Sequence, residues 1–290
     1  MTLRNLKIFI TVADCKNMTA ASKLLFIAQP TVSQAISELE NHYGIKLFER
    51  LSKRLYLTED GSRLLNYARH IIALYDEMEL AMEDPGKSAL LKIGASVTIG
   101  AELLPIIVNR FSDLESTIKI NAIINNTTEI ENLIIKNDID FALVEGSVHN
   151  QNITAIPFMD DELMFVCGKN HPLYNSSISS LEELGKYDFV VRERGSGTRE
   201  LFESVMTANN ADWILHWECN GSDSIISAAV NGIGIAIISK RLVKRELQSG
   251  NLKEIQVPAV DLRRKFNIIH HKNKYITENM KLFFDLCKNS

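Results

Sequence analysis

The sequence has 290 residues, of which 46% are hydrophobic and 23% are charged, and its formal net charge is -4 at pH 7. This length allows two or three domains with sizeable cores, and the composition is ordinary for a soluble globular protein. There is no apolar run of membrane-spanning length, no signal-peptide pattern and no paired spacing of the four cysteines. We therefore expect a cytoplasmic protein with neither disulfides nor membrane attachment.

The charge is distributed unevenly along the chain. Residues 1–65 contain nine Lys and Arg against six Asp and Glu, a net charge of +3, which leaves -7 for the remainder. A basic segment joined to an acidic body indicates a nucleic-acid-binding module attached to a domain with a different task.

The first elements form a helical pattern. Apolar spacing predicts a helix over residues 3–13, followed by a hairpin of two helices over residues 18–43 with a turn near residues 26–28. Thr19 would cap the first helix of the hairpin. The second would start at Gln29 with Pro30 at its first position, where proline is tolerated. Val32, Ile36 and Leu39 recur at helical spacing and predict one buried face.

The outward face of the second hairpin helix carries amides and hydroxyls instead of the usual Lys and Glu. These residues are Gln29, Thr31, Ser33, Gln34 and Ser37. Such groups form hydrogen bonds to base edges and phosphates. The pattern therefore predicts a helix-turn-helix whose recognition helix begins at Gln29. The alternative is a helical hairpin that belongs to a larger core, because small polar residues also cap helices.

A basic ribbon is predicted after the hairpin. Leu47 and Phe48 provide an apolar anchor, and Leu55 and Leu57 alternate back toward the core. Three cations, Arg50, Lys53 and Arg54, crowd the tip of this two-stranded wing. They would lie against phosphates or in a minor groove. The alternative is a solvated basic turn.

The first sixty residues resemble the LysR family of bacterial transcription regulators. The resemblance is carried by Phe9, Ala20, Ala21, Leu24, Gln29, Pro30, Val32, Ser33, Ile36, Leu39, Glu40, Gly44, Leu47, Phe48, Glu49, Arg50, Leu57, Thr58 and Gly61. It implies a winged helix-turn-helix that binds double-stranded promoter DNA. Two positions depart from the family pattern: Ala28 replaces the usual Ser or Thr cap, and Gln34 replaces a common Arg or Lys that contacts phosphate.

One long helix is predicted over residues 58–82. Apolar residues at alternating steps of four and three form a seam typical of a two-helix coiled contact. They are Leu64, Ala68, Ile71, Tyr75, Met78 and Met82. The resemblance implies that this linker helix pairs two subunits in a homodimer or homotetramer; the alternative is a helix packed on its own domain. Asp84-Pro85-Gly86 then breaks the helix and marks a domain boundary.

Beyond Ser88 strands and helices alternate, which predicts parallel sheets in two α/β lobes. The fold class is α+β overall: a winged helix-turn-helix at 1–58, a linker helix at 59–84 and an effector domain at 89–290. Lobe I takes residues 89–163 and 263–290, and lobe II takes residues 164–262. This layout is periplasmic-binding-protein-like and matches the effector domain of the family. A polar turn is expected at 95–100, before a helix at 103–114.

The loops at the carboxyl ends of the strands predict an effector site between the lobes. Its candidates are Ser96, Thr98, Thr127, Gly146, Gly195, Ser196, Gly197 and Thr198. Glycines and hydroxyls at a helix N-terminus present N–H groups to an anion, so the expected ligand carries a carboxylate or an inorganic oxyanion. Alternatively, Ser196 or Thr198 only caps its helix. Arg192, Arg194 and Arg199 could add charge, although each is more often a surface residue.

Other chemistry is weakly supported. The sequence contains neither a G-x-S-x-G elbow nor a P-loop, and its His and Cys pairs lack a matching second pair for a metal. We therefore expect no enzyme activity, metal or cofactor. The interpretation is a regulator in which a small anionic effector alters dimer or tetramer assembly on promoter DNA. The alternative is a cytoplasmic small-molecule-binding protein or enzyme that uses its N-terminal hairpin for oligomerisation.

Overall fold

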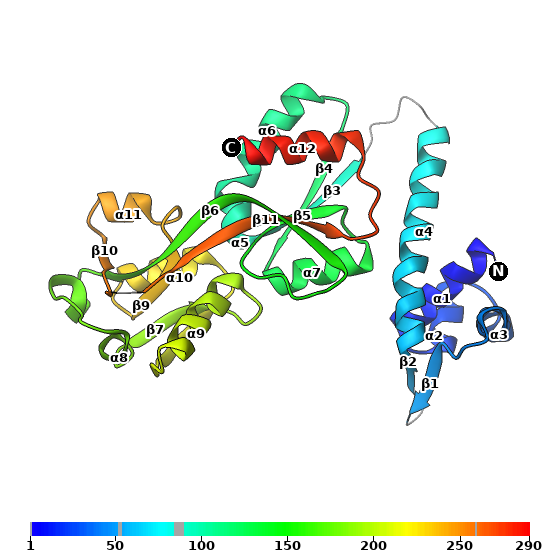
Figure 1. Ribbon diagram of the computed structural model, residues 1–290, viewed down its shortest axis with the longest axis horizontal. Helices are drawn as coiled ribbons and strands as arrows, with labels where there is room; N and C mark the ends of the chain where they lie inside the picture. Colours follow the sequence, from blue (N-terminus) through cyan, green and yellow to red (C-terminus); the bar gives the residue numbers. More distant parts are fainter. Residues whose placement is uncertain (1, 52–53, 84–89, 259) are drawn as a thin grey trace. The chain divides into compact units, whose positions relative to one another are not determined.

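The computed structural model describes residues 2–51, 54–83, 90–258 and 260–290 (Figure 1). The chain divides into two units, Met1–Lys87 and Ser88–Ser290, each with its own internal contacts. The predicted helix break at Asp84-Pro85-Gly86 lies outside the described residues.

The first unit packs four helices and a two-stranded ribbon around one core. Its elements are α1 (Leu3–Cys15), α2 (Met18–Leu24), α3 (Gln29–Tyr43), β1 (Phe48–Leu51), β2 (Arg54–Leu57) and α4 (Glu59–Glu83). Phe9, Val12, Val32 and Leu39 are completely buried, because the apolar stripes of α1 and α3 face each other. The predicted helices, hairpin and ribbon are confirmed.

The caps of the hairpin helices differ from the prediction in one respect. Asn17, not Thr19, caps α2, because its Oδ1 accepts the N–H groups of Thr19 and Ala20 at 2.8 and 3.0 Å. The predicted cap role of Thr19 is therefore wrong. Pro30 is the second residue of α3, still within the turn whose N–H groups have no partner in the helix. Ala28 provides no side-chain cap, as the sequence indicated.

The second unit is built on one mixed sheet with the strand order β4-β3-β5-β11-β6-β9-β7-β8, and β10 pairs with β6. Its strands are β3 (Leu90–Ser96), β4 (Lys119–Asn125), β5 (Phe141–Glu145), β6 (Ile153–Gly168), β7 (Asp188–Arg192), β8 (Ile214–Cys219), β9 (Ile235–Ser239), β10 (Leu252–Ile255) and β11 (Arg263–His271). Strands β3, β4 and β5 are parallel, as are β7, β8 and β9. Two groups of parallel strands thus form the two lobes.

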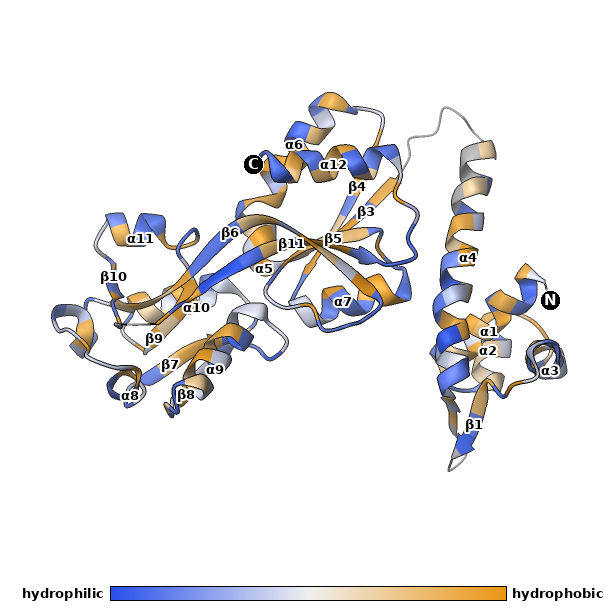
Figure 2. Ribbon diagram, viewed as in Figure 1, coloured by the Kyte–Doolittle hydropathy of each residue, from blue (hydrophilic) through white to orange (hydrophobic). Residues whose placement is uncertain are grey.

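Strands β6 and β11 join the lobes. They run antiparallel from Ile153↔His271 to Glu162↔Arg263, after which β6 pairs with β9. Figure 2 shows the stretches of β6 and β11 between the lobes in blue, whereas the buried strand β7 is orange. The charged stretch lies where the two strands leave one hydrophobic core and enter the other.

Helices cover both faces of each lobe. They are α5 (Val97–Glu102), α6 (Leu104–Leu114), α7 (Thr127–Lys136), α8 (Leu181–Leu184), α9 (Gly197–Ala208), α10 (Ser222–Val230), α11 (Lys244–Gln248) and α12 (Glu278–Lys288), with a 3₁₀ turn at Pro172–Asn175. In lobe I, α6 and α12 pack on one face and α7 on the other. In lobe II, α9 and α10 belong to separate clusters on the two faces of the sheet.

One local expectation differs from the structure, and two strands had not been predicted. The stretch expected to be a turn at 95–100 instead forms the end of β3 and the start of α5, in which Thr98, Ile99 and Gly100 are buried. Strand β8 was not predicted, and in the structure five of its six residues are exposed. Strand β10 has only four residues, too few for a clear periodicity.

Candidate functional site

The recognition helix α3 has one buried and one polar face. Gln29, Pro30, Gln34 and Ser37 are exposed, and Thr31 and Ser33 are half-buried. Thr19 is exposed near the start of α2.

One residue on the polar face of α3 is already engaged within the protein. Gln34 Nε2 donates to Glu38 Oε1 at 3.0 Å, and Glu38 Oε2 accepts from Asn5 Nδ2 at 2.9 Å. These bonds tie α3 to α1 and direct the amide of Gln34 toward Glu38.

The wing is a short antiparallel ribbon that pairs Phe48↔Leu57 at its base and Leu51↔Arg54 at its tip. The Phe48 ring lies 5.5 Å from the Phe9 ring, centroid to centroid, and anchors the ribbon on the core. Arg50 is exposed on β1. Lys53 lies outside the described residues, and for Arg54 only the backbone is described.

Helix α4 presents its apolar residues in two different directions. Ala68 is completely buried in the core of its own domain, where Leu64 and Ile72 also pack. The seam predicted through Ala68 is therefore not the exposed one. Among the α4 side chains that the structure describes, the exposed large apolar ones are Tyr67, Ile71, Leu74, Met78 and Met82. Tyr75 is half-buried, with Lys7 Nζ 5.8 Å from its ring centroid.

The predicted effector residues converge at the junction of the two lobes. From lobe I, Thr98 Oγ1 donates to Glu145 Oε1 at 3.3 Å, and Thr127 Oγ1 donates to the Glu145 carbonyl oxygen at 3.4 Å. Ser96 at the end of β3 is completely buried. The hydroxyls of α5, α7 and β3 are thus gathered around the end of β5.

The lobe II residues lie at the start of α9. Ser196 caps this helix, because its Oγ accepts the N–H group of Thr198 at 3.3 Å. Thr198 Oγ1 accepts from Arg264 Nη1 at 2.9 Å, so this hydroxyl contacts β11. Ser196 thus caps α9, and Thr198 connects the same helix to β11.

Three glycines let the lobes approach closely. A Cβ atom on Gly197 would lie 2.4 Å from the Glu145 carbonyl oxygen, and one on Gly146 would lie 3.3 Å from Gly197 Cα. Gly146 and Gly195 have φ angles of 86° and 89°, which favour glycine. The Gly195 carbonyl oxygen accepts the N–H group of Thr128 from lobe I at 3.1 Å.

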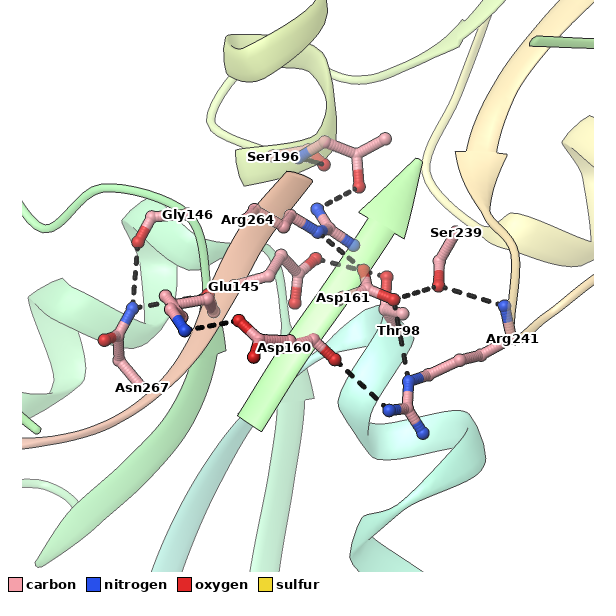
Figure 3. A network of polar contacts seen from close by, with 12 residues as sticks. Thr98, Glu145, Gly146, Asp160, Asp161, Ser196, Ser239, Arg241, Arg264 and Asn267 are labelled. Carbon is pink, nitrogen blue, oxygen red and sulfur yellow. Dashed lines mark hydrogen bonds and ion pairs between the residues drawn. The ribbon is translucent and has the colours of Figure 1, made fainter. Parts of the chain in front are cut away.

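Charged residues that the sequence did not single out complete the junction (Figure 3). Arg264 Nε donates to Asp161 Oδ2 at 2.7 Å, and Ser239 Oγ donates to Asp161 Oδ1 at 2.7 Å. Glu145 is 1% exposed. The sequence offers one indication of the burial of Glu145, because this residue directly follows the apolar run of β5.

Two arginines that were expected at the surface are buried. Arg192 is 2% exposed, at the end of β7, and donates from Nε and Nη2 to Glu193, at 2.8 Å each. Arg199 is 4% exposed and pairs with Glu203 and Glu218. Arg194 is exposed, as expected. The burial of Arg192 places a cation next to the predicted glycines.

The junction has an unusual electrostatic balance. Burial raises the pKa of Glu145, and the nearby charges of Arg264 and Arg192 oppose this rise only in part. Within the described part of the chain, four side-chain atoms here are buried without a hydrogen-bond partner: Ser96 Oγ, Glu145 Oε2, Arg192 Nη1 and Arg264 Nη2. Buried polar groups are normally satisfied, so this set suits a small polar ligand.

Other kinds of site are not evident. Across the described residues, no cluster of three or more His, Cys, Asp and Glu has an arrangement suited to a metal ion. No helix in the same residues combines the length and apolar character needed to cross a membrane.

Two family models match the chain. The model for the bacterial regulatory helix-turn-helix protein, lysR family, covers residues 3–62, and the model for the LysR substrate binding domain covers residues 85–290. The chain belongs to the LysR family of transcriptional regulators. It is accordingly a ligand-responsive, DNA-binding regulator and not an enzyme.

This LysR-family chain is also similar to full-length relatives. It is 32% identical to the "Uncharacterized HTH-type transcriptional regulator YeiE" of Escherichia coli K12, covering 99% of this chain and 97% of the relative. The CcmR regulatory domain of Synechocystis PCC6803 in complex with 2-PG has a TM-score of 0.64 and 20% identity, over 70% of this chain and 97% of that domain. Full-length CbnR complexed with the target DNA has a TM-score of 0.60 and 18% identity, over 100% and 99%.

Proposed function

We propose that this regulator reads promoter DNA with α3 and the β1–β2 wing, and that a small anion held between the two effector lobes controls how its dimers and tetramers assemble. The observation that carries the effector assignment is the pair of buried arginines, Arg192 from lobe II and Arg264 from β11. Each has one guanidinium nitrogen without a partner among the described residues. A guanidinium group matches the oxygens of carboxylates and other oxyanions.

The N-terminus of α9 supports the same assignment. This helix has 12 residues, and its first turn begins at the lobe junction with Gly197 and Thr198. The N–H groups of a first helical turn have no carbonyl partner within the helix, and together with the helix dipole they favour a negative charge at this end. Ser96, with its completely buried hydroxyl, would donate from the opposite lobe. The anion would thus meet donors from both lobes and favour one arrangement of them.

On DNA, one set of residues would contact the bases and another set would contact the phosphates. Gln29, Pro30, Thr31, Ser33 and Ser37 would face the major groove. Thr19, Arg50, Lys53 and Arg54 would hold phosphates. Gln34 would contribute less, because its amide bonds Glu38. The similarity in fold to full-length CbnR, solved with its target DNA, supports this use of the hairpin.

For assembly, the proposal assigns the contact between subunits to the exposed stripe of α4. Tyr67, Ile71, Leu74 and Met78 follow steps of four, three and four, which is the spacing of a coiled-coil seam. Exposed apolar side chains at this spacing would be covered by the same helix of a second copy. In this proposal, the linker helix takes residues 59–84, between a DNA-binding domain at 1–58 and an effector domain at 89–290.

Three measurements test the proposal. A thermal-shift screen of small carboxylates and inorganic oxyanions should find a ligand that raises the unfolding temperature of the protein. The double variant Ser96→Ala/Thr198→Val should bind that ligand at least tenfold more weakly, because each lost hydrogen bond to a charged group contributes about 1.5–3 kcal/mol. Gel shifts with DNA from upstream of its own gene should be unaffected in this variant.

A matched control uses the same changes at exposed positions. Ser249→Ala/Thr207→Val alters lobe II away from the junction and should leave ligand affinity unchanged. Equal affinity of the junction variant and the parent would place the effector elsewhere, and a parent that shifts no upstream DNA would contradict the assigned DNA site.

A further inference from the structure

We propose that Glu145 and the bound anion share one proton, so that the effector is an oxyanion or carboxylate whose binding takes a proton into the cleft. This inference rests on the proposed effector site and specifies its chemistry. A ligand that still carries an acidic hydrogen brings the proton with it. A fully deprotonated ligand binds together with a proton taken from water, which then lies between Glu145 Oε2 and a ligand oxygen.

Among the described residues, the four side-chain atoms without a hydrogen-bond partner at the junction are three possible donors and one carboxylate oxygen. Arg192 Nη1, Arg264 Nη2 and Ser96 Oγ can each donate to a ligand oxygen, but an ionised Glu145 Oε2 can only accept. Two acceptors cannot form a hydrogen bond, and two negative charges in one buried site repel each other. A proton between them turns this conflict into a hydrogen bond. All four atoms then have a partner.

The neighbours of Glu145 leave this Oε2 atom to the ligand. From α5, Thr98 donates to the other carboxylate oxygen, Oε1, and from α7, Thr127 donates to the main-chain carbonyl oxygen. From α9, Gly197 approaches with backbone only. The charged groups that face Glu145 are Arg192 on β7 and Arg264 on β11.

Each arginine at the junction has a carboxylate partner other than Glu145. Arg192 donates through Nε and Nη2 to Glu193, and Arg264 donates through Nε to Asp161, which Arg241 also faces at 3.6 Å. Each cation therefore keeps a carboxylate partner when Glu145 is protonated. The site can accept the proton without leaving an isolated buried charge.

Burial favours the protonated form further. The pKa of Glu145 is already raised by desolvation in the free protein, and a bound anion adds a like charge that raises it again. Binding of a deprotonated anion is therefore accompanied by proton uptake at any pH where the free protein holds Glu145 ionised.

The test uses sulfate and acetate as probes, because both remain deprotonated between about pH 6 and about pH 8.5, so that any pH dependence arises in the protein. For the parent protein, affinity measured by calorimetry should fall with rising pH, approaching about tenfold per pH unit above the pKa of Glu145. Runs in two buffers of different ionisation enthalpy should show about one proton taken up per anion at the upper end of this range.

The variant Glu145→Gln isolates the proton. Its amide always offers a donor in place of the shared proton, so its affinity should be independent of pH and should exceed that of the parent at high pH. The matched control Glu254→Gln, at an exposed position of β10, should keep the pH profile of the parent. If Glu145→Gln does not fold, the proton count of the parent decides: no uptake overturns the proposal.

The outcomes separate this inference from the effector site itself. If Ser96→Ala/Thr198→Val loses anion binding, the effector site stands. If Glu145→Gln then shows the same pH profile as the parent, proton sharing is overturned. Absence of binding by both probes to the parent and to Glu145→Gln at every pH overturns both proposals. Uptake of about one proton by the parent and none by Glu145→Gln supports the inference.

Discussion

Asp161 on β6 and Arg264 on β11 stand opposite each other in the antiparallel ladder and form an ion pair of 2.7 Å, with side chains only 1% and 3% exposed. Ser239 donates to the same carboxylate, and Thr198 accepts from the same guanidinium group. The pair thus connects the two strands that join the lobes with β9 and α9 of lobe II.

The variant Asp161→Ala should lower the free energy of unfolding by about 3–5 kcal/mol, because it leaves Arg264 charged and buried without its main partner. Chemical denaturation of the full chain measures this loss. Glu278→Ala is the control, since Glu278 and Lys281 form an exposed pair of 2.7 Å whose removal should change the stability far less. Similar losses in both variants would contradict the role of the buried pair.

The variant Arg50→Ala should weaken binding to all DNA sequences alike and should lower the salt dependence of the association constant by about one counterion. Gln29→Ala should instead reduce discrimination between the specific site and altered sites, because amides read base edges. Fluorescence anisotropy at several salt concentrations distinguishes these effects. Arg110→Ala, on the effector domain, serves as the control, and an unchanged salt slope for Arg50→Ala would remove the wing from the DNA interface.

The variant Ile71→Asp should halve the mass of the assembled protein in sedimentation experiments, because it places an unpaired charge in the proposed helix contact. Ser62→Asp adds the same charge to the same helix outside the stripe and should leave the mass unchanged. If the mass of Ile71→Asp equals that of the parent, the exposed stripe of α4 does not join subunits.

Acid should destabilise the effector domain through His271. Burial, with the nearby charges of Lys272 and His270, lowers the pKa of this imidazole from 6.5 to about 4. A pKa that is lower in the folded state gives stability that is complete above pH 6.5 and is lost as the pH falls toward 4. The measurement is the melting temperature as a function of pH. His271→Asn keeps an acceptor for the N–H group of Asn273, and its melting temperature should fall less than that of the parent as the pH falls toward 4. His149→Asn, at an exposed histidine, should behave like the parent.

The winged helix-turn-helix could be predicted from sequence because its signals are local. The periodicity of Val32, Ile36 and Leu39 defines a buried face within one helix, and the ribbon follows within twenty residues. The same periodicity does not show which stripe of α4 its own domain covers. Ala68 and Ile71 both satisfy helical spacing, yet only the folded core shows that Ala68 is inside and Ile71 is outside.

The hydroxyls and glycines of the junction could be predicted because each follows a strand or precedes a helix. The charged residues could not, because their partners lie far away in the sequence. Glu145 and Arg264 meet only after β5 and β11 pair in the sheet. Arg192 directly follows the apolar run of β7, as Glu145 follows that of β5, but this position alone does not identify the partners of either residue.

The contact of Gly146 with Gly197 determines how the lobes can move. A Cβ atom on Gly146 would lie 3.3 Å from Gly197 Cα, so the two backbones leave little room for a side chain at this point. A movement that keeps this spacing would be a rotation of lobe II about it, and α9 would turn with the lobe, because Phe202 and Met206 pack in the lobe II core. The 12 residues of α9 extend about 18 Å, so a rotation of about 3° displaces the far end near Ala208 by about 1 Å. If the proposed anion binds beside this point and turns the lobe, the resulting displacement would therefore grow along α9 toward Ala208.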